Sequence, residues 1–278
     1  MGIRPNFLVI GAMKAGTTSL YRLLCRHPQI GMSREKEPAF FCADEIFARG
    51  WAWYESLFTD AYGKTAVGEA STSYTKRYVY PRAAERIGEH LPDARLIYVV
   101  RHPLERIESQ WMHGVHQGWH SSSFRRALEE PGLLDPSRYW SQISAYRKFF
   151  PDERILVLLF DEFKHRPAEF MSQVFRFLGV DPDAPLGELG KAENASTSME
   201  SERPILSRLR CLPRFTQAMG LLPLAWRNEV KQRWFTRRML LRPVWRAMDR
   251  QKVLAAIGDD IREFLQFYGK PIDHWNLS

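Results

Sequence analysis

An apolar run followed by a glycine-containing loop, at residues 7–19, constrains this chain more than any other segment. The run Phe7–Ile10 has the composition of a buried strand, and a helical pattern of leucines begins at Leu20. Gly11 and Gly16 lie in the loop between them. A glycine-containing turn between a strand and a helix gathers backbone N–H groups around an anion, and the helix dipole adds to the attraction. The segment therefore predicts an α/β fold with a phosphate-binding loop.

The position of the lysine in this loop narrows the choice of anion. In the ATPase-type loop G-x-x-x-x-G-K-[ST], the lysine directly follows the second glycine. Here Thr17 occupies that position, and Lys14 lies inside the loop. The spacing argues against NTP hydrolysis, and no acidic residue at the end of a neighbouring strand is evident as a Mg²⁺ ligand. A P-loop nucleotide kinase or another NTPase stays an alternative.

Further apolar runs alternate with helical patterns along the chain. Such alternation is typical of a parallel sheet that is covered on both faces. We therefore expect a P-loop-type central parallel sheet with helices on both faces. The expected strands are 65–70, 95–100 and 154–160, and the expected helices are 81–90, 103–119 and 167–178.

Composition and charge set broader bounds. The chain has 278 residues and a formal net charge of +8, which suits an anionic ligand, a nucleic acid or an anionic membrane surface. Its 3 cysteines, in no CxxC spacing, are typical of reduced thiols. No apolar run approaches the ~18–20 residues that span a bilayer. The first strand also begins too early for a signal peptide. We expect a cytoplasmic protein.

The composition of the chain becomes strongly basic after Asn194. Residues 203–250 carry eleven arginines and one lysine against Glu229 and Asp249, a net charge of +10, together with tryptophan and leucine side chains. We expect one domain over 1–278, with a core at 1–194 and a helical, basic C-terminal subdomain at 195–278 that ends in a helix over 253–268. A basic protein that binds nucleic acid or a membrane surface is a second alternative. As a secondary property we expect peripheral membrane contact through 203–250, and no nucleic-acid partner.

A second segment, residues 101–109, complements the first loop. Arg101 follows the expected strand 95–100, and Ser109 comes about two helical turns later. Both could reach one phosphate at the carboxyl edge of the sheet, where ligands bind in open α/β folds. Taken alone, Arg101 and Arg106 could equally be surface residues. Combined with the first loop, the segment predicts two separate anion sites, which a nucleotide phosphorylated at two places would fill.

These motifs resemble those of the sulfotransferases that use 3′-phosphoadenosine 5′-phosphosulfate (PAPS). Residues 11–20 are similar to the family's 5′-phosphosulfate loop, and residues 101–109 match its 3′-phosphate motif, R-x-P-x-x-R-x-x-S. Residues 36–41 resemble the segment K-E-P-x-F-F, and residues 68–74 resemble a fourth block. The closer likeness is to the branch of heparan-sulfate sulfotransferases and bacterial relatives, and it covers residues 6–179.

The resemblance implies transfer of a sulfuryl group from PAPS to a hydroxyl or amine of a carbohydrate, lipid or small natural product. Lys14 would stabilise the leaving phosphate. No metal is implied, because the loop and Lys14 already neutralise the phosphates. The residues implied at the 5′ end are Lys14, Ala15, Gly16, Thr17, Thr18 and Ser19, and those at the 3′ phosphate are Arg101 and Ser109.

The resemblance also assigns the proton-accepting role. It implies Glu37 as the base, while an ion pair with Lys36 or Lys14 is the structural alternative. Glu69 is a second candidate base. His113 aligns with a histidine near the reacting centre in some relatives, although a lone histidine is often structural.

Two departures concern the acceptor side. Ala39 replaces a histidine found in several carbohydrate enzymes, and residues 69–72 read E-A-S-T instead of E-K-S/T-P. Both argue against glycosaminoglycan specificity.

Overall fold

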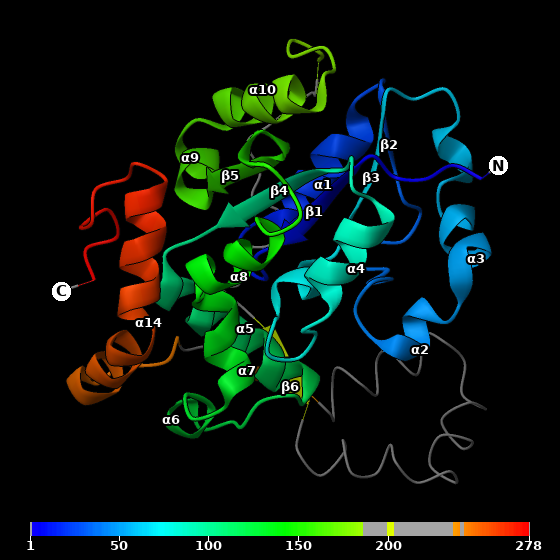
Figure 1. Cartoon of the computed structure of the whole chain (residues 1–278). Helices are drawn as coiled ribbons and strands as arrows, with labels where there is room; N and C mark the ends of the chain where they lie inside the picture. The colour runs from blue at the N-terminus through cyan, green and yellow to red at the C-terminus, as the bar shows by residue number, and fades with distance from the viewer. Residues whose placement is uncertain (1, 186–198, 203–235, 240–241, 278) are drawn as a thin grey trace, which may run out of the picture.

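A five-stranded parallel sheet forms the centre of the protein (Figure 1). The computed structural model describes residues 2–185, 199–202, 236–239 and 242–277. The strand order is β2-β3-β1-β4-β5, and every neighbouring pair is parallel. The predicted α/β fold with a central parallel sheet is thereby confirmed. The strands are β1 (Phe7–Gly11), β2 (Ile30–Met32), β3 (Ala66–Ala70), β4 (Arg95–Val100) and β5 (Ile155–Leu159).

The central strands are buried on both faces because helices flank the sheet (Figure 1). All of β1 and β3, and β4 after Arg95, are buried, which explains their nearly continuous apolar runs. The described helices are α1 (Thr17–Arg26), α2 (Asp44–Phe47), α3 (Gly50–Ser56), α4 (Ala83–His90), α5 (Pro103–Gln117), α6 (Phe124–Ala127), α7 (Pro131–Leu134), α8 (Tyr139–Tyr146), α9 (Phe160–His165), α10 (Pro167–Leu178) and α14 (Ala247–Phe267). Short 3₁₀ helices join them at η1 (Thr59–Ala61), η2 (Thr72–Thr75), η3 (Asp135–Ser137) and η4 (Asp152–Arg154).

Several element bounds differ from those expected. β5 ends at Leu159 because Phe160 begins α9, and α5 ends at Gln117 because Gly118 closes it with a φ of 76°. α14 starts at Ala247, six residues earlier than its apolar pattern indicated. The short edge strand β2 was not predicted.

The described C-terminal residues contain strands as well as a helix. β6 (Met199–Glu202) and β7 (Thr236–Met239) form an antiparallel pair, and β6 lies beside α5. The expected C-terminal helix is present as α14, and the strand pair β6–β7 adds to it a feature that the sequence did not predict. Residues 186–198, 203–235 and 240–241, which hold most of the predicted basic segment, lie outside the described residues.

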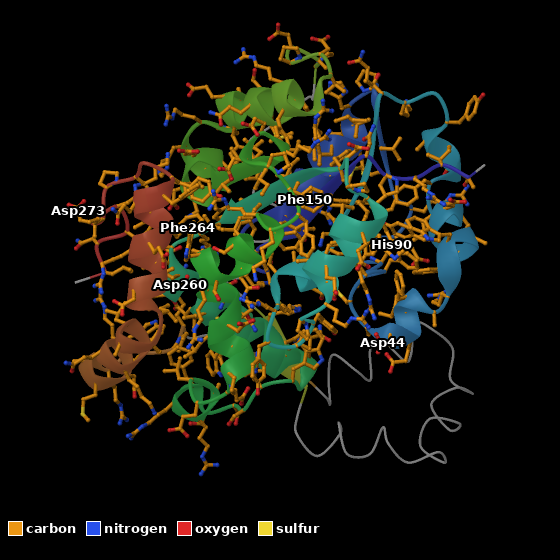
Figure 2. All side chains as sticks on the ribbon, viewed as in Figure 1. Asp44, His90, Phe150, Asp260, Phe264 and Asp273 are labelled. Atoms are coloured by element: carbon orange, nitrogen blue, oxygen red, sulfur yellow. The ribbon has the colours of Figure 1, made fainter. Side chains whose placement is uncertain are left out.

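A carboxylate attaches α14 to the core. Asp260 accepts hydrogen bonds from the N–H groups of Trp140 at 2.9 Å and Ser141 at 2.8 Å, in the first turn of α8. Asp260 and Phe264 lie on the side of α14 that faces the core (Figure 2), and the Phe264 ring packs 5.5 Å from that of Tyr139. Asp260 thus caps α8 from a distant part of the chain, where its own sequence offers no capping side chain.

Asp260→Ala should lower the free energy of unfolding by about 1–2 kcal/mol, since two first-turn N–H groups lose their acceptor. Burial raises the pKa of Asp260 to about 6, so the folded protein retains a proton that the unfolded chain releases near pH 4. The stabilisation by Asp260 therefore falls as pH rises from about 4 to 6. Urea unfolding at pH 4.5 and pH 7 should show the larger loss at the lower pH, and the exposed Asp259→Ala is the control.

Candidate active site

The carboxyl ends of three neighbouring strands bring the predicted site residues together. β1 lies between β3 and β4, with Val9 in register with Ala70 on one side and with Ile97 on the other. The chain runs from β1 to β2 and β3, and then crosses to β4 on the opposite side of β1. Ligands bind at such reversals in open α/β sheets. The loop after β1 and the segment after β4 emerge beside each other there.

The loop after β1 ends in an uncapped helix N-terminus. Gly16 precedes α1 with a φ of 83°, and a Cβ atom on it would lie 2.3 Å from the Phe160 ring, so glycine fits this turn and larger residues do not. No side chain of the described residues caps α1, and its first turn holds no acidic residue. The N–H groups of Thr17, Thr18 and Ser19 are therefore available to bind an anion.

In the loop after β1, the Lys14 side chain lies near other positive charges, whereas the Ala15 N–H is hydrogen-bonded within the loop. Burial lowers the pKa of Lys14, and so do the positive charges of Arg101 and Lys36. These three cations approach the same region closely enough to repel, and a phosphate-bearing ligand would offset the repulsion. The N–H of Ala15 donates to the carbonyl of Ala12 at 3.1 Å, so it is already engaged within the loop.

Arg101 reaches the same loop from the end of β4. Its Nη1 donates to the Lys14 carbonyl at 3.4 Å, while Nε and Nη2 donate to the Glu105 carboxylate at 3.0 and 2.6 Å. The guanidinium lies 5.3 Å from the centroid of the Phe160 ring. Ser109 is buried two turns further along α5. The structure therefore places the two predicted anion sites next to each other, with Glu105 in the fork of Arg101.

Arg106 is a structural residue, and the surface interpretation is wrong for it. Its side chain is fully buried and donates to the hydroxyl of Ser137, to Gln110 Oε1 at 2.5 Å and to the Leu133 carbonyl at 2.7 Å. These contacts tie α5 to α7 and η3. All three partners are uncharged acceptors, so the role of Arg106 is to hold α5, the helix that carries Ser109, against α7 and η3.

Glu37 presents a fixed but accessible carboxylate. Its Oε2 accepts the Thr72 N–H at 2.7 Å, and its Oε1 forms an ion pair with Lys36 at 2.5 Å, as the structural alternative predicted. The side chain is still 35% exposed, so an acceptor can reach it. The structure is thus compatible with both interpretations of Glu37.

The backbone that carries Glu37 is strained. Glu37 has a φ of 63° and Ala39 a φ of 51°, both in the left-handed region. Such a conformation costs about 1–2 kcal/mol for each residue that is not glycine. Contacts with the end of β3 hold it, because the Glu37 N–H donates to the Ala70 carbonyl at 3.0 Å and the Ala39 N–H donates to Ser71 Oγ at 2.9 Å.

Glu69, the second candidate base, lies beneath the site. Its side chain is fully buried, and its carboxylate accepts hydrogen bonds from the hydroxyls of Tyr54, Ser71 and Tyr74. A base must contact the acceptor hydroxyl or amine. The geometry therefore favours Glu37 over Glu69 for that role.

His113 and Lys76 complete the polar surroundings. Burial and the charge of Lys14 lower the pKa of His113 to about 4, so its imidazole is neutral at neutral pH. The Lys76 charge contributes to the same shift, and Glu37 raises the pKa of Lys76 against the lowering effect of burial. Sequence reasoning missed Lys76 because its nearness to these groups depends on how η2 folds back on β1.

The described residues offer neither a metal-binding cluster nor a membrane-spanning helix. Among them, no group of three or more histidine, cysteine, aspartate and glutamate side chains could hold a metal ion. Within the same ranges, no helix combines the length and apolar character needed to cross a membrane.

Comparison with known proteins decides the family. The family model described as "Sulfotransferase domain" matches residues 4–202. The chain belongs to the sulfotransferase domain family. The resemblance drawn from the loop and the arginine motif is thereby confirmed.

The relatives of this sulfotransferase-family chain include two human enzymes. It is 30% identical over 186 residues to heparan sulfate glucosamine 3-O-sulfotransferase 6, with 63% of this chain and 52% of that protein covered. It is 30% identical over 201 residues to bifunctional heparan sulfate N-deacetylase/N-sulfotransferase 3, with 64% and 22% covered. The chain thus matches about half of the one relative and under a quarter of the other.

A solved structure from a bacterium is similar to this chain in fold. The sulfotransferase from Alicyclobacillus acidocaldarius superposes with a TM-score of 0.70 at 25% identity, covering 99% of each chain.

Proposed function

We propose that this chain moves a sulfuryl group from PAPS to a hydroxyl or amine of an acceptor. The observation that carries the proposal is the meeting of two anion sites at one edge of the sheet: the uncapped N-terminus of α1 with Lys14, and Arg101 after β4. A donor with phosphates at its 5′ and 3′ positions matches this pair. Membership of the sulfotransferase domain family supports the same reaction.

Each residue then has a defined task. When bound, PAPS supplies an activated sulfuryl group whose leaving group is a 5′ phosphate. Thr17, Thr18 and Ser19 hold that phosphate, while the Lys14 ammonium neutralises the charge that develops on its bridging oxygen. Glu37 takes the proton of the acceptor at its exposed carboxylate. The reaction is an in-line displacement, so correct positioning supplies much of the rate.

His113 contributes as a neutral imidazole in this scheme. Its pKa of about 4 means that it carries no charge at the working pH. Its ring can orient an acceptor hydroxyl by hydrogen bonding, and it does not add a titration step near pH 6.5.

Calorimetric titration with 3′,5′-adenosine bisphosphate, in parallel with ATP and ADP, tests the donor site. Tight binding of the bisphosphate and weak binding of ATP would support the proposal. A preference for ATP would favour the kinase alternative, and no nucleotide binding would redirect attention to the basic C-terminal segment.

Arg101→Ala should weaken binding of 3′,5′-adenosine bisphosphate by about 2 kcal/mol, or about thirtyfold, because the 3′ phosphate loses a charged partner. The matched control is Arg154→Ala, since Arg154 pairs with Asp93 and precedes β5 at the opposite edge of the sheet. An unchanged affinity in Arg101→Ala would remove this residue from the donor site. Isothermal calorimetry provides both values.

The acceptor class is a separate proposal: a carbohydrate, a lipid or a small natural product. The heparan sulfate enzymes named above support a carbohydrate, while Ala39 and the E-A-S-T sequence at residues 69–72 argue against glycosaminoglycans. Incubation with radiolabelled PAPS and representatives of the three classes separates them.

We also propose a cytoplasmic location and a peripheral contact between residues 203–250 and anionic membranes. The net charge of +10 in that segment supports the contact. So do Val244 and Met248, which are 85% and 77% exposed among arginines. Co-sedimentation with vesicles of phosphatidylserine and phosphatidylcholine tests the contact, and binding that does not depend on the phosphatidylserine content would contradict it.

The free thiols of Cys25 and Cys42 support the proposed cytoplasmic location.

A further inference from the structure

The buried carboxylate of Glu69 is not explained by the tasks given above. It lies near the end of β3, fully buried and in register with Leu8 of β1. Oε1 accepts the hydroxyl of Tyr74 at 2.5 Å and that of Tyr54 at 3.2 Å, and Oε2 accepts the hydroxyl of Ser71 at 2.7 Å. An ionised carboxylate, which only accepts hydrogen bonds, suits three hydroxyl donors best, because it adds no hydrogen of its own to this buried site.

Ser71 connects this carboxylate to the segment of the proposed base. A serine hydroxyl has one hydrogen, and here Ser71 gives it to Glu69. The oxygen of Ser71 is then oriented to accept the Ala39 N–H, which it does at 2.9 Å. Ala39 lies two residues after Glu37, in the strained turn described above.

The 3₁₀ helix η2, which begins directly after Ser71, contacts Glu37 itself. Thr72, which follows Ser71, donates its N–H to Glu37 Oε2 at 2.7 Å and its hydroxyl to Oε1 at 3.1 Å. Tyr74, at the end of this turn, donates to Glu69. Glu69 therefore binds both ends of the short segment 71–74 that holds the Glu37 backbone and carboxylate.

We propose that Glu69 is a positioning residue for Glu37, acting through Ser71 and the Ala39 N–H to hold the carboxylate of Glu37 toward the acceptor. This inference rests on the proposed function, because it assigns a support to the proposed base. Its chemical basis is that an ionised acceptor beneath the site fixes the direction of one hydroxyl hydrogen. A protonated or amide side chain at the same place would leave that direction unfixed.

Burying the ionised carboxylate of Glu69 costs folding free energy, and this cost indicates that the carboxylate is present for function. Burial raises the pKa of Glu69 to about 7, and the hydrogen bonds from Tyr74 and Ser71 act in the opposite direction. An ionised Glu69 is thus unfavourable for folding at pH 8, and removal of its charge should not cost stability there.

Glu69→Gln and Ser71→Ala, studied at pH 8, test the proposal. Hydrogen exchange of the free protein should be about tenfold faster at the Ala39 amide in both variants, with little change elsewhere. The kcat for the acceptor found with PAPS should fall about tenfold or more, while the Kd for 3′,5′-adenosine bisphosphate should stay within about threefold. The melting temperature of Glu69→Gln should equal or exceed that of the original protein. Tyr146→Phe is the control, because that hydroxyl is buried nearby and donates to the Tyr74 carbonyl instead.

The double variant separates action through Ser71 from an independent effect. If Glu69 acts through Ser71, Glu69→Gln should add little to Ser71→Ala in either the exchange rate or kcat. Additive effects, an unchanged Ala39 amide, or uniformly faster exchange with a lower melting temperature would overturn the proposal. Ser71→Ala alone keeps the test valid if Glu69→Gln does not fold. Failure to find any transfer in the original protein would contradict the proposed function, whereas the exchange measurements would still decide the role of Glu69.

Discussion

Lys14→Ala should lower kcat about 10²–10³-fold while weakening the binding of 3′,5′-adenosine bisphosphate much less. The reason is that the ammonium group acts mainly on the charge that develops on the leaving oxygen, and one such preorganised donor is worth roughly 2.7–4 kcal/mol. Lys14 has a φ of 69°, and alanine in that conformation is no more strained than lysine. Single-turnover transfer from labelled PAPS and calorimetry together give the two quantities.

Lys64→Ala is the matched control for this prediction. Lys64 is exposed, and its Nζ donates to the Pro28 carbonyl at 2.5 Å, away from the carboxyl ends of the strands. Its loss should leave kcat unchanged. If Lys14→Ala kept full transfer activity with normal donor binding, another cation would have to serve the leaving group, and Lys36 and Lys76 would be the next residues to replace.

Glu37→Gln should lower kcat about 10²–10⁴-fold with an unchanged Kd for 3′,5′-adenosine bisphosphate. An amide at this position keeps the size of the side chain and can still accept the Thr72 N–H, but it cannot take a proton from the acceptor. Steady-state kinetics and calorimetry measure the two quantities.

Glu35→Gln controls for general effects on the same segment. Glu35 is exposed and lies two residues before Glu37, so its replacement should leave kcat unaltered. A fully active Glu37→Gln would show that its contacts with Lys36 and Thr72 are its whole role. Proton removal would then need another group, such as the neutral imidazole of His113.

The sheet and the donor side of the site could be predicted because their signals are local in sequence. An apolar strand, two glycines and an internal lysine define the loop after β1 without any knowledge of distant residues. Arg101 could be assigned for the same reason, since it directly follows a strongly apolar strand. The short edge strand β2 gave no such signal, because three residues are too few to show a period.

The residues around Glu37 could not be placed in this way. The sequence left Glu69 as an alternative to Glu37, and only the fold shows that Glu69 is enclosed by three hydroxyls from α3, η2 and the end of β3. Arg106 shares a motif with Arg101, yet its partners Ser137 and Leu133 lie about thirty residues away and turn it into a buried support. Burial and long-range partners decide such roles, and neither is encoded in local spacing.

The contact between Arg101 and Glu105 has a consequence for ligand choice. Because Glu105 occupies Nε and Nη2 of Arg101, a phosphate that takes these two donors exchanges with an existing interaction and does not simply add one. A dianionic 3′ phosphate can win this exchange, since it brings more charge than a single carboxylate. A nucleotide without a 3′ phosphate leaves the internal pair intact and gains nothing from the arginine. Selectivity between PAPS and the more common nucleotides would then arise from competition inside the protein, with no need for a barrier that keeps ATP out.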